Sequence, residues 1–183
     1  MAIRRARLVA LAALAALGGL GGGAVLIANA PEAVGLADAP VPKLPVLDRL
    51  VVNKSQRTME LWADGRLVHT IRGIQLGDAP VGPKRFEGDE RTPEGEFEID
   101  WGNENSAYTL SLHISYPRPQ DTAFARAQGR SPGGMIMIHG QPNWLAAGRL
   151  PGDWTDGCIA VSNAEIEALW EAVPNGTPIE IRA

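Results

Sequence analysis

Cys158 has the side chain best suited to covalent chemistry in this sequence. It is the single cysteine of the 183-residue chain, and it stands between Gly157 and an apolar run that begins at Ile159. A cysteine attacks a carbonyl carbon as its thiolate, so it needs a base or a positive neighbour to lower the pKa of the thiol. The glycine permits a tight turn that presents the sulfur beside backbone N–H groups, which can hold an oxyanion. We therefore expect a nucleophile, with a buried, unreactive cysteine as the alternative.

His139 is the leading candidate for the base. It ends the apolar run from Gly134 to Ile138 and is followed by Gly140, so we expect it to emerge at the end of a buried strand. The loop from Gly140 to Gly157 contains several Gly and Pro residues and can fold back to bring His139 to Cys158. A nucleophile and a base would then meet from distant parts of the sequence.

The two other histidines have weaker claims. His69 lies in an expected hairpin strand, where a partly exposed structural residue is the better interpretation. His113 is expected to line the core or a groove. The three histidines and Cys158 lack the short spacings of structural zinc motifs, and no glycine motif for phosphate is present outside the N-terminal segment, so neither a metal nor a cofactor is expected.

The elements that must position these residues are mainly strands. Short alternating or apolar runs bounded by Gly, Pro or Asn predict strands at residues 49–53, 57–62, 67–74, 96–101, 108–115, 134–138, 159–161 and 177–182. One segment has a clear helical pattern, because Ser162 and Glu165 form a capping box and Ile166 and Leu169 begin an apolar face. The sequence therefore predicts a mainly β domain.

The N-terminal segment is typical of an exported protein. Arg4, Arg5 and Arg7 precede an uncharged run from Leu8 to Ala28, so residues 1–30 are expected to be a signal peptide or an N-terminal inner-membrane anchor. Residues 31–46 are rich in proline and predict a linker. The folded domain should then span residues 47–183 and lie in the periplasm or cell envelope.

Composition limits the remaining possibilities. With 45% apolar and 21% charged residues, the chain can form one ordinary globular domain and is not a disordered protein. The formal net charge is −4 at pH 7, although three arginines stand at the N-terminus. The domain itself is therefore acidic, which argues against a nucleic-acid partner.

The order of these motifs resembles the L,D-transpeptidase family, the YkuD-type catalytic domain. That family has a His-Gly pair ahead of a Ser/Thr-His-Gly-Cys element, and here His139-Gly140 precedes Thr155-Asp156-Gly157-Cys158. The stretch 82–95 is similar to the family's G-D-x-x-T-P-x-G region, and residues 176–181 match its closing strand. The likeness extends over about residues 47–182.

The resemblance implies an antiparallel β-sandwich with one or two short helices and a cysteine acyltransferase that acts on peptidoglycan stem peptides. Cys158 would attack the carbonyl of the third stem residue to form a thioester, with His139 as general base. Backbone N–H groups around Gly157 and Cys158 would hold the oxyanion, and the Gly140 carbonyl would orient the imidazole. An amine of a second stem, or a lysine of an envelope lipoprotein, would then capture the thioester.

Two positions depart from the family pattern. Asp156 stands where the family commonly has His, and Ala160 where it commonly has Arg or Asn. We expect Asp156 to be a further polar partner of His139 that stabilises a thiolate–imidazolium pair; a carboxylate that faces solvent or substrate is the alternative. The candidate substrate-binding side chains are His113, Tyr116 and Arg91.

Three functions remain open from the sequence. The first is an L,D-transpeptidase that cross-links peptidoglycan or attaches protein to it. The second is a hydrolase, an L,D-carboxypeptidase or endopeptidase, that uses the same Cys158 and His139. The third is a wall-binding module without activity, which the intact pair disfavours.

Overall fold

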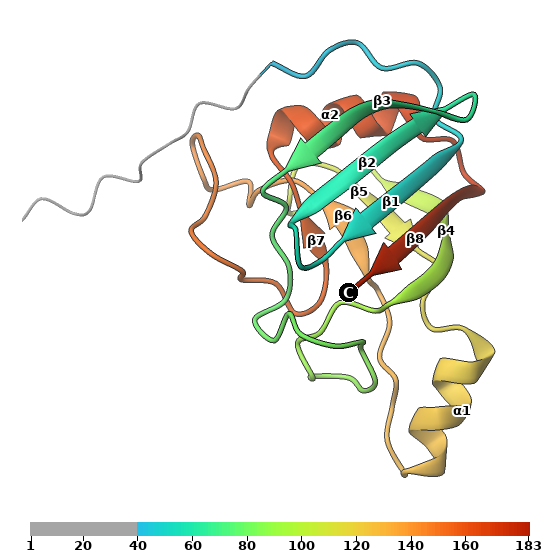
Figure 1. Ribbon diagram of the computed structural model, residues 1–183. Helices are drawn as coiled ribbons and strands as arrows, with labels where there is room; N and C mark the ends of the chain where they lie inside the picture. The colour runs from blue at the N-terminus through green and yellow to red at the C-terminus, as the bar shows by residue number, and fades with distance from the viewer. Residues whose placement is uncertain (1–39) are drawn as a thin grey trace, which may run out of the picture. The chain divides into compact units, whose positions relative to one another are not determined.

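The computed structural model describes residues 40–183, and this unit consists of eight strands and two short helices (Figure 1). The expected targeting segment at residues 1–30 and most of the expected linker lie outside the described residues. The strands are β1 (Arg49–Asn53), β2 (Thr58–Ala63), β3 (Arg66–Arg72), β4 (Gly95–Asn103), β5 (Ser111–Ile114), β6 (Met137–His139), β7 (Ile159–Ala160) and β8 (Thr177–Arg182). The helices are α1 (Pro119–Ala127) and α2 (Asn163–Ala172).

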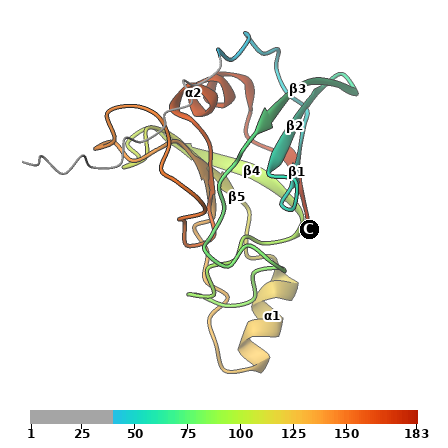
Figure 2. The same cartoon turned by 60° about the vertical axis from the view of Figure 1, so that its left-hand side comes forward.

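All eight strands belong to one sheet, in the order β3-β2-β1-β8-β4-β5-β6-β7. Neighbouring strands are antiparallel except for β1 with β8 and β6 with β7, which are parallel. The sheet curls, so that β1, β2 and β8 lie in front of β5, β6 and β7 in Figure 1, and β1 and β2 lie to one side of β5 in the turned view of Figure 2. The expected mainly β fold is confirmed, and its two layers are halves of one continuous sheet.

The apolar core lies between the two halves of the sheet and α2. Alternate residues of the strands point into it, among them Leu50, Leu61, Ile138 and Ile179. Each fully buried aliphatic side chain of this kind contributes about 1.5–3 kcal/mol. The predicted strands are therefore found, because their period-2 apolar pattern matches one buried face.

Helix α2 confirms the predicted helix, including its start. The Ser162 side chain accepts the Glu165 N–H at 3.2 Å, and the Glu165 carboxylate accepts the Ser162 N–H at 2.8 Å. Ile166 and Leu169 are completely buried against the sheet. The N-cap thus fixes where the helix begins relative to β7, whose last residue is Ala160.

Helix α1 lies at the opposite end of the unit from α2 (Figure 2). Its residues Asp121 and Ala125 are buried, whereas Phe124 is exposed and its ring centroid lies 5.9 Å from that of Phe86. This contact joins the helix to the 82–94 segment. Neither helix of residues 40–183 is long and apolar enough to cross a membrane.

A buried lysine fixes the 82–94 segment against the sheet. Lys54 is 2% exposed, and its ammonium donates to the Gly82 carbonyl at 2.7 Å, the Thr92 carbonyl at 3.1 Å and the Glu94 carboxylate at 2.9 Å. Burial lowers the pKa of Lys54, although Glu94 opposes that shift. Because an ammonium has three N–H donors, all of them are satisfied by this one segment.

Candidate active site

The register of β6 and β7 places Cys158, the residue before β7, beside the strand that ends at His139. Ile138 pairs with Ile159 and His139 with Ala160, so Cys158, one residue earlier, comes opposite Met137. Side chains alternate along a strand, and paired residues face the same side of a sheet. Cys158 and His139 therefore lie on the same face, the one opposite the core face that holds Ile138 and Ile159.

Gly157 permits the turn that presents the thiol. Its φ is +121°, and a Cβ on this residue would lie 2.5 Å from the Arg91 carbonyl oxygen. Both the backbone conformation and the available space therefore require a residue without a side chain. The expected tight turn before Cys158 is present, and the 82–94 segment forms its outer wall.

The Cys158 thiol is partly exposed and lies among backbone groups. The sulfur accepts the Met137 N–H at 3.4 Å and lies 3.6 Å from the Met135 carbonyl, which can only accept the S–H proton. Burial raises the pKa of the thiol and Asp156 raises it further, while the Met137 N–H and the Lys84 ammonium lower it. The protonated thiol is thus the resting form at neutral pH.

The His139 imidazole is 4% exposed and has a fixed orientation. Its Nδ1 lies 2.7 Å from the Gly140 carbonyl oxygen. A carbonyl oxygen only accepts, so Nδ1 carries the proton and Nε2 of the neutral ring is left as a base. Burial lowers the pKa of His139, partly offset by the bond to Gly140. The Gly140 carbonyl therefore makes the contact expected of it.

Two aromatic rings pack on this imidazole. The ring centroid of Tyr108 lies 4.6 Å from that of His139, and the ring centroid of Trp154 lies 5.5 Å from it. Neither residue is indicated by the sequence, since neither belongs to a spacing pattern. Both rings therefore lie against the buried imidazole.

The two backbone N–H groups expected to hold an oxyanion have different surroundings. The Gly157 N–H already donates to the Thr155 hydroxyl at 3.2 Å, and that hydroxyl donates to the Cys158 carbonyl at 2.8 Å. The Cys158 N–H, in contrast, has no acceptor among residues 40–183. The Gly157 N–H is thus engaged within the turn and the Cys158 N–H is available, and the oxyanion role of these backbone groups stays a prediction.

Asp156 does not have the relation to His139 that the sequence led us to expect. The pKa of His139 responds to burial and to Gly140, not to this carboxylate, whereas Asp156 raises the pKa of Cys158. Like charges repel, so the carboxylate disfavours the thiolate. Asp156 is exposed, and no hydrogen bond or ion pair joins it to His139 among residues 40–183, so its partnership with His139 stays a prediction without support from these contacts.

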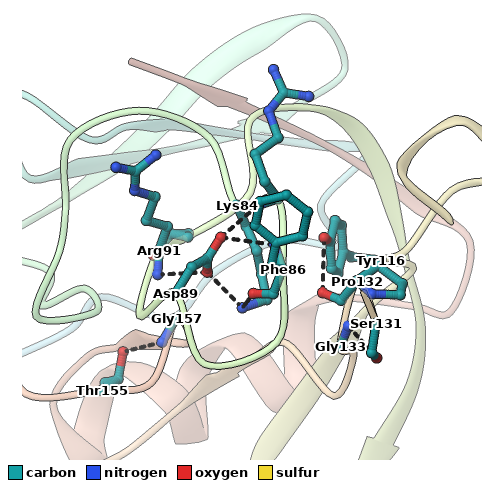
Figure 3. Close-up of polar contacts among 12 residues, drawn as sticks. Lys84, Phe86, Asp89, Arg91, Tyr116, Ser131, Pro132, Gly133, Thr155 and Gly157 are labelled. Carbon is teal, nitrogen blue, oxygen red and sulfur yellow. Dashed lines mark hydrogen bonds and ion pairs between the residues drawn. The ribbon is translucent and has the colours of Figure 1, made fainter. Parts of the chain in front are cut away.

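Asp156 lines a cavity of about 400 Å³ that borders the turn. The lining residues are Lys84, Glu87, Gly88, Glu90, Gly133, Gly134 and Asp156. Lys84 is another residue that the sequence did not indicate: it is 4% exposed and its ammonium binds the Asp89 carboxylate at 2.9 Å and the Phe86 carbonyl at 3.1 Å (Figure 3). Its buried positive charge opposes the effect of Asp156 on the thiol.

Tyr116, expected to bind substrate, is a core residue. It is 3% exposed, and its hydroxyl donates to the Pro132 carbonyl at 3.1 Å (Figure 3). Burial, with the charges of Asp121 and Asp89, raises the pKa of Tyr116 to about 12. The expectation was wrong because Tyr116 lies just beyond the end of β5 with its ring against Phe97, on the core side.

Arg91 contributes its backbone to the site. Its N–H donates to the Asp89 carboxylate at 3.2 Å and its carbonyl contacts the turn at Gly157, while its side chain extends away from that turn (Figure 3).

His113 lies on β5 opposite Met137, hence on the same face as His139. The His113 ring binds the Asp100 carboxylate at 2.6 Å and stacks on Trp101 with ring centroids 4.6 Å apart. Substrate contacts of Arg91 and His113 stay predictions.

No three His, Cys, Asp or Glu side chains of residues 40–183 converge as a metal site. The groups described above are of the types that acyl transfer requires: a thiol, an imidazole with a fixed orientation and a backbone N–H without an acceptor among residues 40–183.

The chain matches the family model of the L,D-transpeptidase catalytic domain, YkuD, over residues 47–181. It therefore belongs to the L,D-transpeptidase catalytic-domain family, as the sequence motifs indicated. The comparison with curated proteins finds no match.

Solved structures are similar to this fold. The helical cell shape determining protein Pgp2 from Campylobacter jejuni is 28% identical with a TM-score of 0.60, and the match covers 74% of this chain and 47% of Pgp2. Bd1075 from Bdellovibrio bacteriovorus is 21% identical with a TM-score of 0.52, covering 78% of this chain and 52% of that one. An L,D-transpeptidase (Yku) from Stackebrandtia nassauensis is 11% identical with a TM-score of 0.51, covering 78% and 58%. The chain thus spans about half the length of these neighbours.

Proposed function

We propose that the protein is a cysteine-dependent L,D-transpeptidase that acts on peptidoglycan stem peptides in the cell envelope. The observation that carries this proposal is that Cys158, just before β7, and His139, at the end of β6, lie on the same face of the sheet, with the imidazole held by the Gly140 carbonyl. Membership of the L,D-transpeptidase family supports the substrate class. The similarity to a cell-shape protein of Campylobacter supports a role in the wall.

The first half of the reaction forms a thioester. As the sulfur attacks the stem carbonyl, the thiol proton passes to Nε2 of His139, and the developing oxyanion accepts the Cys158 N–H. The carbon–nitrogen bond to the terminal D-alanine then breaks, and the imidazolium returns the proton to the departing amine. The enzyme retains the acyl group on Cys158, and the histidine is neutral again.

The second half transfers the acyl group. An amine from a second stem peptide attacks the thioester, loses a proton to His139 and forms the new amide, and the thiol is regenerated with that proton. A lysine of an envelope lipoprotein would be captured in the same way, which would attach protein to the wall. Water in place of the amine gives a carboxylate, and the same site then acts as a hydrolase.

The test is incubation of the protein with tetrapeptide-rich peptidoglycan, followed by mass spectrometry of the muropeptides. Cross-linked dimers that lack one D-alanine are the expected product, and Cys158→Ala should give none. Tripeptides without dimers would identify the hydrolase instead. Wild-type protein that leaves tetrapeptides unchanged would contradict both enzymatic readings.

A thioester on the intact chain is the direct sign of the mechanism. The mass of the wild-type protein should increase by that of the acyl group when the reaction is stopped with acid, and hydroxylamine should remove this mass. Cys158→Ser serves as the matched variant, because its hydroxyl fits the same space but is a much weaker nucleophile near neutral pH.

A further inference from the structure

One peptide group links the imidazole to helix α2. The carbonyl of Gly140 accepts Nδ1–H of His139 at 2.7 Å, and the N–H of the same peptide, on Gln141, donates to Asn163 Oδ1 at 2.8 Å. The peptide unit is planar, and its C=O and N–H point in opposite directions. A bond that fixes the N–H therefore also fixes the direction of the carbonyl.

The Asn163 oxygen is itself held in place. The Thr109 hydroxyl donates to it at 2.9 Å, and Asn163 is the first residue of α2, directly after the N-cap Ser162. The capping box holds the start of that helix. The acceptor for the Gln141 N–H is therefore part of a rigid element and not of the loop.

Gly140 makes the close approach possible. A Cβ at this position would lie 2.7 Å from Asn163 Oδ1 and 2.9 Å from a methyl carbon of Ile166. Any larger residue would displace the asparagine or the helix. The close contact with α2 therefore explains why a glycine follows His139. Backbone conformation does not require it, since the φ of Gly140 is not in the left-handed region.

We propose that Asn163 is a positioning residue for His139, acting through the peptide between Gly140 and Gln141. In Ser–His–Asp sites a carboxylate holds the histidine in the right tautomer; here an asparagine does so by way of one peptide group. A chain of hydrogen bonds polarises its members, so the Gly140 carbonyl accepts the imidazole proton more strongly. The part of this inference that concerns turnover rests on the proposed function, whereas the effect on the imidazole does not.

The test determines the tautomer of His139 in the full chain from two-bond 15N–1H NMR correlations. The His139→Gln variant, which lacks the imidazole, identifies the signals of His139. Wild type should carry its proton on Nδ1. Asn163→Leu, which has a similar size but no acceptor, should lose that preference. It should also lower kcat by about 10- to 100-fold, by analogy with groups that orient the histidine ligands of metals. KM should change much less. Asn163→Asp, which keeps an acceptor oxygen, should restore the Nδ1–H tautomer.

Two variants separate positioning from stability. Ser162→Ala removes the cap of the same helix and should lower the melting temperature without changing the tautomer. Asn163→Ser suits a helix start and cannot reach Gln141, so it should change the tautomer even if Asn163→Leu does not fold. An unchanged tautomer in Asn163→Ser, or an equal change in Ser162→Ala, would overturn the inference. Wild type with the Nδ1–H tautomer and no muropeptide turnover would instead refute the proposed function.

Discussion

Substitution of Lys54 by Met tests how the 82–94 segment is held. Met keeps most of the length of the side chain and removes the ammonium, which leaves the Glu94 carboxylate and two carbonyls without their donor. Removing one partner of a buried ion pair costs about 3–5 kcal/mol. The Glu94 side chain is 21% exposed and can be partly hydrated, so we expect the lower end, about 3 kcal/mol.

Urea and thermal unfolding followed by circular dichroism would measure this loss. For a domain of this size, about 3 kcal/mol corresponds to a decrease of roughly 10 °C in melting temperature. Lys43→Met is the matched control, because Lys43 is exposed and its loss should change the stability by less than about 0.5 kcal/mol. Glu94→Gln added to Lys54→Met should recover part of the loss, since the unpaired charge is then removed. If Lys54→Met is as stable as the Lys43 variant, the buried ammonium does not hold the segment and the reasoning is wrong.

The remaining predictions concern the site. His139→Ala should lower turnover by about 10²- to 10⁴-fold, while His69→Ala should retain activity near that of the wild type; equal losses would mean that the base is misassigned. Cys158→Ala should abolish turnover yet melt close to the wild type, because the thiol is partly exposed, and unfolding of this variant would show that the cysteine is structural. Asp156→Asn should lower the pKa of Cys158, because removal of a negative charge favours the thiolate. The rate of alkylation against pH measures that shift, and a midpoint that rises would contradict the electrostatics described above.

The strands and α2 could be predicted from the sequence because their signals are local. Period-2 apolar runs and the capping box at Ser162 act over a few residues, and these elements are found. Their limits were less well predicted: β6 begins at Met137 and not at Gly134, since Gly133 and Met135 have positive φ and interrupt the extended chain. Helix α1 has only two buried residues, so no apolar face marked it.

The site could be predicted only in part, because most of its contacts join segments that are distant in the sequence. Cys158 and His139 stand in a recognisable order, but the residues around them come from distant segments. Lys54 and Lys84 look like surface lysines in the sequence, and only the folded chain shows that both are buried. Tyr116 was expected to bind substrate, yet the chain beyond the end of β5 places its ring in the core.

The resting state of the pair follows from the two pKa shifts taken together. Burial raises the pKa of Cys158 and lowers that of His139, so both shifts favour the neutral thiol and the neutral imidazole over an ion pair. In the proposed reaction, the thiol proton would therefore move as the sulfur attacks. This transfer requires an imidazole whose Nε2 is already unprotonated, and the bond from Nδ1 to Gly140 provides that tautomer. The same bond stabilises the imidazolium when it forms, so the orientation of one peptide group contributes to both steps of proton transfer.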